Sequence, residues 1–281
     1  MSNTFQGKSK EDIQTLISRL QADLNPVNSR RILGLLDFTS LNVTDTQGTI
    51  EDICEKVNNY QFVFPDLPCF AAICVYPRFV DLLRKKLAVP SVKVVSVAGG
   101  FPSAQSTTNV KLAEVKEAVE SGADEIDIVM PVGEFLRGNK NYIMDETAAI
   151  KEIIGDKHLK LIIESGLLAD PELIYDASIL AMEAGADFIK TSTGKEKASA
   201  SLEAVYVMSH AIKNFHHATG KIVGIKPAGG IATVNDALGY YSLVEMLLGP
   251  QWLLPESFRI GASRLANKLL SEVEGRNVEY F

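Results

Sequence analysis

The sequence predicts a single (β/α)8 (TIM) barrel with an extra N-terminal helix before the first strand. Apolar runs alternate with amphipathic segments along the whole chain, and the runs are near-continuous in Val, Ile and Leu, as is typical of parallel strands covered on both faces. The length of 281 residues suits one such barrel. A doubly wound open sheet is the structural alternative, but no GxGxxG follows the first apolar run.

Eight short apolar runs are expected to form the strands: ILGLLDF from Ile32, FAAICVY from Phe70, VKVVSVA from Val92, DEIDIVM from Asp124, LKLIIES from Leu159, DFIKTS from Asp187, KIVGIKP from Lys221 and FRIGAS from Phe258. Helices are expected near residues 9–23, 49–60, 77–88, 109–121, 142–155, 170–185, 202–218 and 233–248, and from about 262 onward. Two of these helices should end at Gly122 and Gly185, because glycine supplies a left-handed cap before the next strand. We expect one domain over residues 1–281, with its core at about 30–273 and a flexible tail at 274–281.

Composition excludes several classes of function. The net charge is −7 and no dense Lys/Arg cluster occurs, so nucleic acid is not an expected partner. The N-terminus lacks an apolar leader and no window approaches 18 apolar residues, so we expect no membrane association and a cytoplasmic location. Three cysteines without CxxC spacing indicate reduced thiols and neither a disulfide framework nor a zinc site.

The four histidines argue against a metal site. His158 precedes the fifth expected strand, at the wrong end of a barrel, and His210, His216 and His217 fall within an expected helix. A zinc-dependent enzyme would place imidazoles at the carboxyl ends of the strands, where the chemistry of such barrels gathers. We therefore expect no metal site.

Chemically active side chains cluster where the expected strands end. These candidates are Asp37, Cys74, Asp127, Glu164, Lys190, Lys226 and the glycines around Gly261. A buried ammonium group is unfavourable unless it is paired with a carboxylate or deprotonated. A lysine at the end of a buried strand is therefore expected to have a charged partner or a lowered pKa. The sixth and seventh strands each end on such a lysine.

Lys190 and Lys226 should be neighbours if the inward faces of their strands match. Adjacent strands lie about 4.8 Å apart, which would place the two amines roughly 6 Å from each other. At an effective dielectric constant of about 20, two positive charges at that distance repel by about 2.8 kcal/mol, or roughly two pKa units. One amine would then be partly neutral and able to form a Schiff base with a carbonyl. The alternative is that each lysine merely pairs with a carboxylate such as Asp127 or Glu164.

Three consecutive loops are rich in glycine: TSTGK, KPAGGIAT and RIGAS, which follow the sixth, seventh and eighth strands. Each can present backbone N–H groups to an anion, and the last leads into a helix whose positive end would face it. The sequence therefore predicts a phosphate site at the place where barrels usually hold one.

With these residues placed, the sequence resembles the deoxyribose-phosphate aldolases. The motifs that carry the resemblance span about residues 33–270: DFIKTSTGK, GIKPAGGI, EIDIVMP, AAICVYPRF, LDFTSLN and FRIGAS. It implies a cofactor-free class I aldolase (a lyase) that reversibly cleaves 2-deoxy-D-ribose 5-phosphate into D-glyceraldehyde 3-phosphate and acetaldehyde, in deoxyribonucleotide catabolism. It also implies that Lys190 is the Schiff-base lysine, that Lys226 is the lysine favouring its uncharged form, and that Asp127 belongs to the proton relay.

The resemblance assigns further residues one by one. It implies that the phosphate and substrate contacts come from Asp37, Thr39, Cys74, Thr193, Gly194, Lys195, Gly229, Gly230, Gly261 and Ser263. Tyr280 matches a tyrosine near the C-terminus that assists enamine protonation. Two positions depart from the family: Ala232 replaces a common arginine, and Arg264 replaces a Ser or Thr. We hypothesise that Arg264 supplies the missing positive charge from the neighbouring loop.

Two other functions remain open at this point. One is a Schiff-base barrel acting on a different sugar or keto-acid phosphate, and the other is a barrel that has lost turnover and serves as a scaffold or binding module. The resemblance also implies a possible homodimer.

Overall fold

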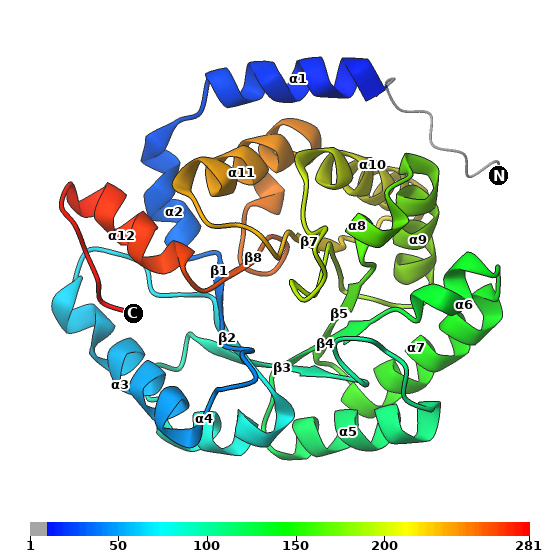
Figure 1. The fold of residues 1–281 in the computed structure, drawn as a ribbon, viewed down its shortest axis with the longest axis horizontal. Coiled ribbons are helices and arrows are strands. Elements are labelled where there is room, and N and C mark those ends of the chain that lie inside the picture. The colour runs from blue at the N-terminus through cyan, green and yellow to red at the C-terminus, as the bar shows by residue number, and fades with distance from the viewer. Residues whose placement is uncertain (1–9) are drawn as a thin grey trace.

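Eight parallel strands form the centre of the molecule. The computed structural model describes residues 10–281, and within them the strands follow the order β7-β6-β5-β4-β3-β2-β1-β8. Their bounds are β1 (Leu36–Thr39), β2 (Ala72–Val75), β3 (Lys93–Ala98), β4 (Glu125–Val129), β5 (His158–Ile162), β6 (Phe188–Lys190), β7 (Gly224–Lys226) and β8 (Ile260–Ala262). Bridges from Ile225 to Phe258 and from Ala228 to Gly261 join the two ends of the sheet. The predicted (β/α)8 barrel is therefore confirmed (Figure 1).

Helices cover the outside of the barrel all around (Figure 1). They are α2 (Ser29–Leu33), α3 (Gln47–Val63), α4 (Val80–Lys86), α5 (Thr108–Glu120), α6 (Val132–Leu136), α7 (Lys140–Ile154), α8 (Ser165–Leu168), α9 (Pro171–Glu183), α10 (Leu202–Thr219), α11 (Val234–Leu248) and α12 (Leu265–Glu274), with 3-10 turns at Pro26–Asn28, Pro77–Phe79 and Pro250–Trp252. The expected extra helix, α1 (Lys10–Ala22), lies outside this ring against α10 and α11. None of these helices is long and apolar enough to cross a bilayer, within residues 10–281.

Local sequence signals explain where several helices begin and end. The Thr233 hydroxyl accepts a hydrogen bond from the Asp236 N–H, and the Asp236 carboxylate accepts one from the Thr233 N–H, which forms a capping box for α11. At Gly122 the backbone φ is 102°, and its N–H donates to the Val119 carbonyl. Gly185, with φ of 98°, plays the same part after α9. The two glycine caps read from the sequence are thus confirmed.

The structure corrects two local expectations. The apolar run from Ile32 does not begin as a strand: its first two residues complete the short helix α2, and β1 starts only at Leu36. Both Ile32 and Leu33 are fully buried, and a short buried apolar run does not by its composition distinguish helix from strand. The last helix begins at Leu265, three residues later than expected.

The tail after α12 is packed where a flexible end was expected. The side chain of Asn267 donates to the carbonyl of Phe281 at 2.7 Å and accepts hydrogen bonds from the N–H groups of Tyr280 and Phe281 at 3.0 and 2.9 Å. The ring of Phe281 lies 5.1 Å from that of Phe38 and 4.8 Å from that of Phe70. Burial of an aromatic ring and a side-chain clamp on the backbone outweigh the entropy of a free end.

Side chains inside the barrel divide into an apolar side and a charged side. Residues that pair in register between parallel strands point to the same side of the sheet. The inward side chains of β2 and β3 are apolar, whereas charged inward side chains come from the other strands and their ends. The apolar set is Ala72, Cys74, Val95 and Val97, against which Leu41 packs from the loop after β1. The charged set, in which no residue is more than 3% exposed, is Asp37, Glu125, Asp127, Lys160, Lys190, Lys226 and Arg259.

Candidate active site

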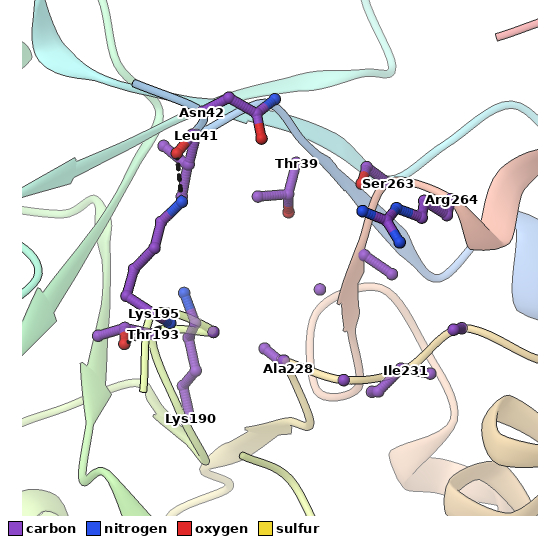
Figure 2. A pocket seen from close by; sticks show the side chains of 16 residues that line it. Thr39, Leu41, Asn42, Lys190, Thr193, Lys195, Ala228, Ile231, Ser263 and Arg264 are labelled. Atoms are coloured by element: carbon purple, nitrogen blue, oxygen red, sulfur yellow. Dashed lines mark hydrogen bonds between the residues drawn. The ribbon is translucent and has the colours of Figure 1, made fainter. Parts of the chain in front are cut away.

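A cavity of about 270 Å³ opens at the carboxyl ends of β1, β6, β7 and β8. The side chain of Lys190 reaches into it from the end of β6, while Thr39 and Arg264 point toward it from the opposite side (Figure 2). The lining residues are Thr39, Leu41, Asn42, Lys190, Thr193, Gly194, Lys195, Ala228, Gly229, Gly230, Ile231, Ala232, Gly261, Ala262, Ser263 and Arg264. The three glycine-rich loops read from the sequence therefore meet at one cavity.

Close backbone packing explains why two of these positions are glycine. A Cβ on Gly229, whose φ is 85°, would lie 2.8 Å from the hydroxyl of Ser199 and 3.0 Å from the Cα of Gly194. A Cβ on Gly261 would lie 2.8 Å from that of Ala228. Without side chains at these positions, the loops after β6, β7 and β8 can pack together, and glycine-rich loops of this kind can present backbone N–H groups to an anion.

Lys190 and Lys226 lie side by side at the ends of β6 and β7, where their Cα positions pair in register. Both amines contact the same oxygen, Oδ2 of Asp127, at 2.8 Å each. The two nitrogens can therefore be no more than about 5.6 Å apart. The structure brings together the three residues expected to carry the chemistry. It also places the carboxylate of Asp127 between the two amines. The two alternatives read from the sequence, neighbouring lysines and lysines paired with a carboxylate, therefore both occur in the structure.

A wider network of buried charges surrounds this trio. Lys226 also contacts Oδ2 of Asp37 at 2.5 Å, and the other oxygen of Asp37 accepts from Arg259 at 2.6 Å. Arg259 in turn donates to Glu125 at 2.8 Å. Lys160 bridges back, contacting Glu125 and lying 3.2 Å from Oδ1 of Asp127. The ion pairs thus form a closed circuit across the interior of the barrel.

Mutual pairing fixes the charge of most of these groups. Burial opposes ionisation of Asp127, but Lys160, Lys190 and Lys226 hold its pKa well below the usual range. Burial likewise opposes the charge on Lys226, but Asp127 and then Asp37 raise its pKa above the ordinary value. The pKa of Asp37 is lowered in the same way by Lys226 and by Arg259, against the effect of burial. These carboxylates are ionised and Lys226 is cationic at neutral pH.

The arrangement suits an amine nucleophile supported by a proton relay. A primary amine reaches a cavity large enough for a small aldehyde, and an ionised carboxylate with a second ammonium lies within hydrogen-bonding distance behind it. Among the described residues, no group of three or more His, Cys, Asp or Glu side chains is placed to hold a metal ion.

Comparison with known proteins agrees with this geometry. A family model described as DeoC/LacD family aldolase matches residues 34–244. The chain belongs to this aldolase family. The deoxyribose-phosphate aldolase of Homo sapiens is 40% identical over 260 residues, which cover 87% of this chain and 81% of the human protein, and that of Mus musculus is 41% identical over 250 residues, covering 85% and 77%.

Solved structures of aldolases share the same architecture. The aldolase QR15 superimposes with a TM-score of 0.70 at 28% identity, covering 86% of this chain and 97% of its own. The tetrameric deoxyribose phosphate aldolase of Aeropyrum pernix superimposes with a TM-score of 0.68 at 23% identity, covering 94% and 98%, which supports the fold.

The expected substrate contacts of the aldolase family do not all reach the cavity. Thr39 and Thr193 line it, as do the expected glycines, Lys195 and Ser263. Asp37 and Cys74 lie deeper in the barrel and are fully buried. Burial raises the pKa of the Cys74 thiol to about 11, so it is a neutral packing group. Asp37 holds Lys226 and Arg259 in place and does not face the cavity.

Arg264 and Ala232, the two departures from the aldolase pattern, line the same cavity. Arg264 is exposed at the start of α12, next to Ser263 (Figure 2). The Lys195 amine is already engaged, since it donates to the carbonyl of Leu41. A positive charge therefore approaches the cavity from the loop after β8 while position 232 offers none.

Tyr280 does not line the cavity, so the structure does not bring it to the residues with which it was expected to act. Its hydroxyl donates to the backbone carbonyl of Lys56 in α3 at 2.7 Å. Its ring packs edge-on against Phe64 at 5.3 Å and Phe281 at 4.9 Å. Aromatic packing between α3 and α12 thus holds the side chain in the helical layer, and the sequence match at the C-terminus gave no information about this packing.

The histidines lie away from the cavity, as expected, and Glu164 follows the fifth strand. His158 begins β5, and its ring nitrogen is 3.6 Å from Glu125 at the amino-terminal end of the barrel. The other three histidines belong to α10. Glu164 accepts a hydrogen bond from the Thr193 N–H, so it braces the loop after β6 and does not pair with either lysine.

Sequence reasoning missed three members of the charge network: Lys160, Glu125 and Arg259. A period-two signal was available for two of them. Glu125 stands two positions before Asp127 on β4, and Lys160 pairs in register with Asp127 on β5, so both share its inward face. Neither Glu125 nor Lys160 ends its strand, so a search of the strand ends alone does not find them.

Proposed function

We propose that Lys190 is the nucleophile with which this chain reversibly cleaves 2-deoxy-D-ribose 5-phosphate into D-glyceraldehyde 3-phosphate and acetaldehyde. The observation that supports this role is the position of its amine, which reaches the cavity and is backed by Asp127 and Lys226. Among the seven interior charged residues, Lys190 is the one that lines the cavity.

In the direction of synthesis, the neutral amine of Lys190 adds to the carbonyl carbon of acetaldehyde, and the carbonyl oxygen takes up a proton to give a carbinolamine. Loss of water gives an iminium, which acidifies the adjacent methyl group. Removal of one methyl proton gives an enamine, whose carbon attacks the aldehyde carbon of glyceraldehyde 3-phosphate. Hydrolysis of the resulting iminium releases the sugar phosphate and restores the amine.

Asp127 and Lys226 are the groups that move protons in these steps. Asp127 contacts both amines and is ionised, so it accepts a proton, and the ammonium of Lys226 donates one. Lys226 does not line the cavity, so a water molecule would connect it to the reacting oxygen. Positioned acid–base groups of this kind contribute roughly 10²- to 10⁴-fold to the rate.

The phosphate would be held by the glycine-rich loops after β6, β7 and β8. Their backbone N–H groups supply hydrogen-bond donors, and Arg264 supplies the positive charge that Ala232 does not. The helix α12 begins at Leu265, immediately after these residues, so its positive end faces the same site.

Reductive trapping tests the role of Lys190. The protein is treated with acetaldehyde and sodium borohydride, and the adduct is located by peptide mass mapping. We expect one reduced adduct on Lys190, and none on Lys190→Met. An adduct on exposed Lys195, or no adduct at all, would contradict the proposal, and the latter result would favour a non-catalytic scaffold. Acetaldehyde as donor separates this activity from a Schiff-base barrel that uses a keto acid.

We also propose a cytoplasmic location and a homodimer. The three cysteines Cys54, Cys69 and Cys74 are free, which suits a reducing compartment. Subcellular fractionation checks the location, and analytical ultracentrifugation of the purified chain checks the assembly.

A further inference from the structure

Lys160 lies at the centre of the interior network but does not line the cavity. Its amine contacts Glu125 on one side and Oδ1 of Asp127, at 3.2 Å, on the other. Lys190 contacts the opposite oxygen, Oδ2, at 2.8 Å. The two amines thus bind opposite oxygens of one carboxylate and lie roughly 7 Å apart.

The buried network holds more positive than negative groups. Four cationic side chains, those of Lys160, Lys190, Lys226 and Arg259, face three carboxylates, those of Asp37, Glu125 and Asp127. With every group ionised, the barrel would enclose one uncompensated positive charge. Such a charge is unfavourable in a buried site, so one of the four groups is favoured to lose its proton.

Other titratable groups around the network do not remove this surplus. Cys74 on β2 is a neutral thiol, and His158 is 39% exposed at the far end of the barrel. Glu164 is buried after β5; burial raises the pKa of its carboxyl, which favours the neutral form, and it forms no ion pair with the four cations. β3 contributes only Val95 and Val97 to the interior apolar set.

The pattern of pairing decides which group gives up its proton. Lys160 contacts two carboxylates, Lys226 contacts two, and Arg259 contacts two. Lys190 contacts one, and it is the member that reaches the cavity. The surplus charge is therefore removed at the least cost by deprotonating Lys190.

We propose that Lys160 is a positioning residue for the aldol reaction, whose charge on the far oxygen of Asp127 keeps Lys190 in its neutral, nucleophilic form. This inference rests on the proposed role of Lys190. The competing explanation is that Lys160 only fills the barrel and pairs with Glu125 for stability. The two explanations differ in what they predict for the pH profile.

Lys160→Met removes one cation and leaves three cations facing three carboxylates, so the surplus disappears. The repulsion lost over about 7 Å is expected to move the acidic limb of kcat/KM upward by roughly one to two pH units. That shift is a loss of about 10- to 100-fold on the acidic limb, and activity should recover at higher pH. The loss should appear in kcat more than in KM.

Two further variants test the charge balance itself. Glu125→Gln leaves four cations facing two carboxylates, so its acidic limb should move downward. The double variant Glu125→Gln with Lys160→Met restores a surplus of one and should return the limb to near its wild-type position, although two side chains of the network have been changed. Recovery in the double variant is not expected if Lys160 acts only through its contact with Glu125.

Lys111→Met is the matched control. Lys111 is 1% exposed and pairs with Glu146 at 2.7 Å between α5 and α7, outside the barrel interior. It should lose stability, as Lys160→Met does, without a shift of the pH profile. Thermal melting checks that each variant folds.

Borohydride trapping separates failure of this inference from failure of the proposed function. If wild type carries its adduct on Lys190 while Lys160→Met shows an unshifted profile, the inference on Lys160 is wrong and the role of Lys190 stands. A double variant that behaves like Lys160→Met would also overturn it. If Lys160→Met does not fold, the direction of the shift in Glu125→Gln decides, since no shift or an upward shift contradicts the charge balance.

Discussion

Asp127→Asn should reduce both stability and activity, because it removes the one carboxylate that three buried lysines share. Lys190 and Lys226 lie 2.8 Å from its Oδ2, and Lys160 lies 3.2 Å from its Oδ1. Without the negative charge, a protonated Lys190 would lie no more than about 5.6 Å from the ammonium of Lys226, where the repulsion at an effective dielectric constant of about 20 is about 3 kcal/mol. Breaking a buried pair by removing one partner costs about 3–5 kcal/mol.

The effect of Asp127→Asn on stability should depend on pH in a defined direction. The pKa of Asp127 in the folded protein is well below that of an unfolded aspartate, which is about 3.9. Its contribution is therefore fully present above about pH 5 and is lost as the pH falls toward the folded-state pKa. Urea unfolding at pH 7 and at acidic pH should show a difference between wild type and variant that shrinks on acidification.

Steady-state kinetics complete this test. We expect kcat for cleavage of deoxyribose 5-phosphate to fall by roughly 10²- to 10⁴-fold, as is usual when a positioned acid–base group is removed. A variant with near wild-type kcat would refute the assignment of Asp127 to proton transfer. A stability difference that does not change with pH would refute the view that its ionised form holds the three amines.

The remaining predictions concern the rim of the cavity and the tail. Arg264→Ala should raise KM for the phosphorylated substrate by roughly 3- to 10-fold without changing the rate of acetaldehyde trapping. The control is Arg276→Ala, at an exposed arginine that pairs with Glu274, which should change neither this KM nor the trapping rate. Gly229→Ala should raise the same KM and lower stability by about 1–3 kcal/mol, because its φ is 85° and its Cβ would crowd Gly194 and Ser199 in the loop after β6; an unchanged KM would argue against the loop as a phosphate site. Tyr280→Phe should cost about 1 kcal/mol of stability and leave kcat intact, since its hydroxyl only donates to a backbone carbonyl; a large loss of kcat, measured by coupled assay, would show that the tail reaches the active site.

The alternation of strands and helices was predictable from sequence because it depends on short-range periodicity. The same periodicity placed Lys190 beside Lys226, and their register pairing confirms that placement. The glycine-rich loops were also recognisable, since a glycine at a strand end reports directly on backbone packing. These features need no knowledge of distant contacts.

Features that depend on distant partners were not predictable in this way. The tail is ordered because Phe281 packs on Phe38 and Phe70, more than 200 positions earlier in the chain, and no local pattern indicates that contact. Tyr280 lies away from the cavity because its ring packs against Tyr60 and Phe64. The short helix α2 was read as part of a strand because its residues are simply apolar and buried.

The charged interior also carries a consequence for stability. Replacing a buried ion network by well-packed side chains is often neutral or stabilising, by about 1–4 kcal/mol, whereas removing a single partner is destabilising. Lys160→Met alone leaves Glu125 with Arg259 and His158 as its partners, but together with Glu125→Gln it removes both charges of one pair. The double variant should therefore unfold at a higher temperature than either single variant. If instead its melting temperature falls by the sum of the two single effects, the two residues are not coupled, and the closed circuit of ion pairs does not act as a unit.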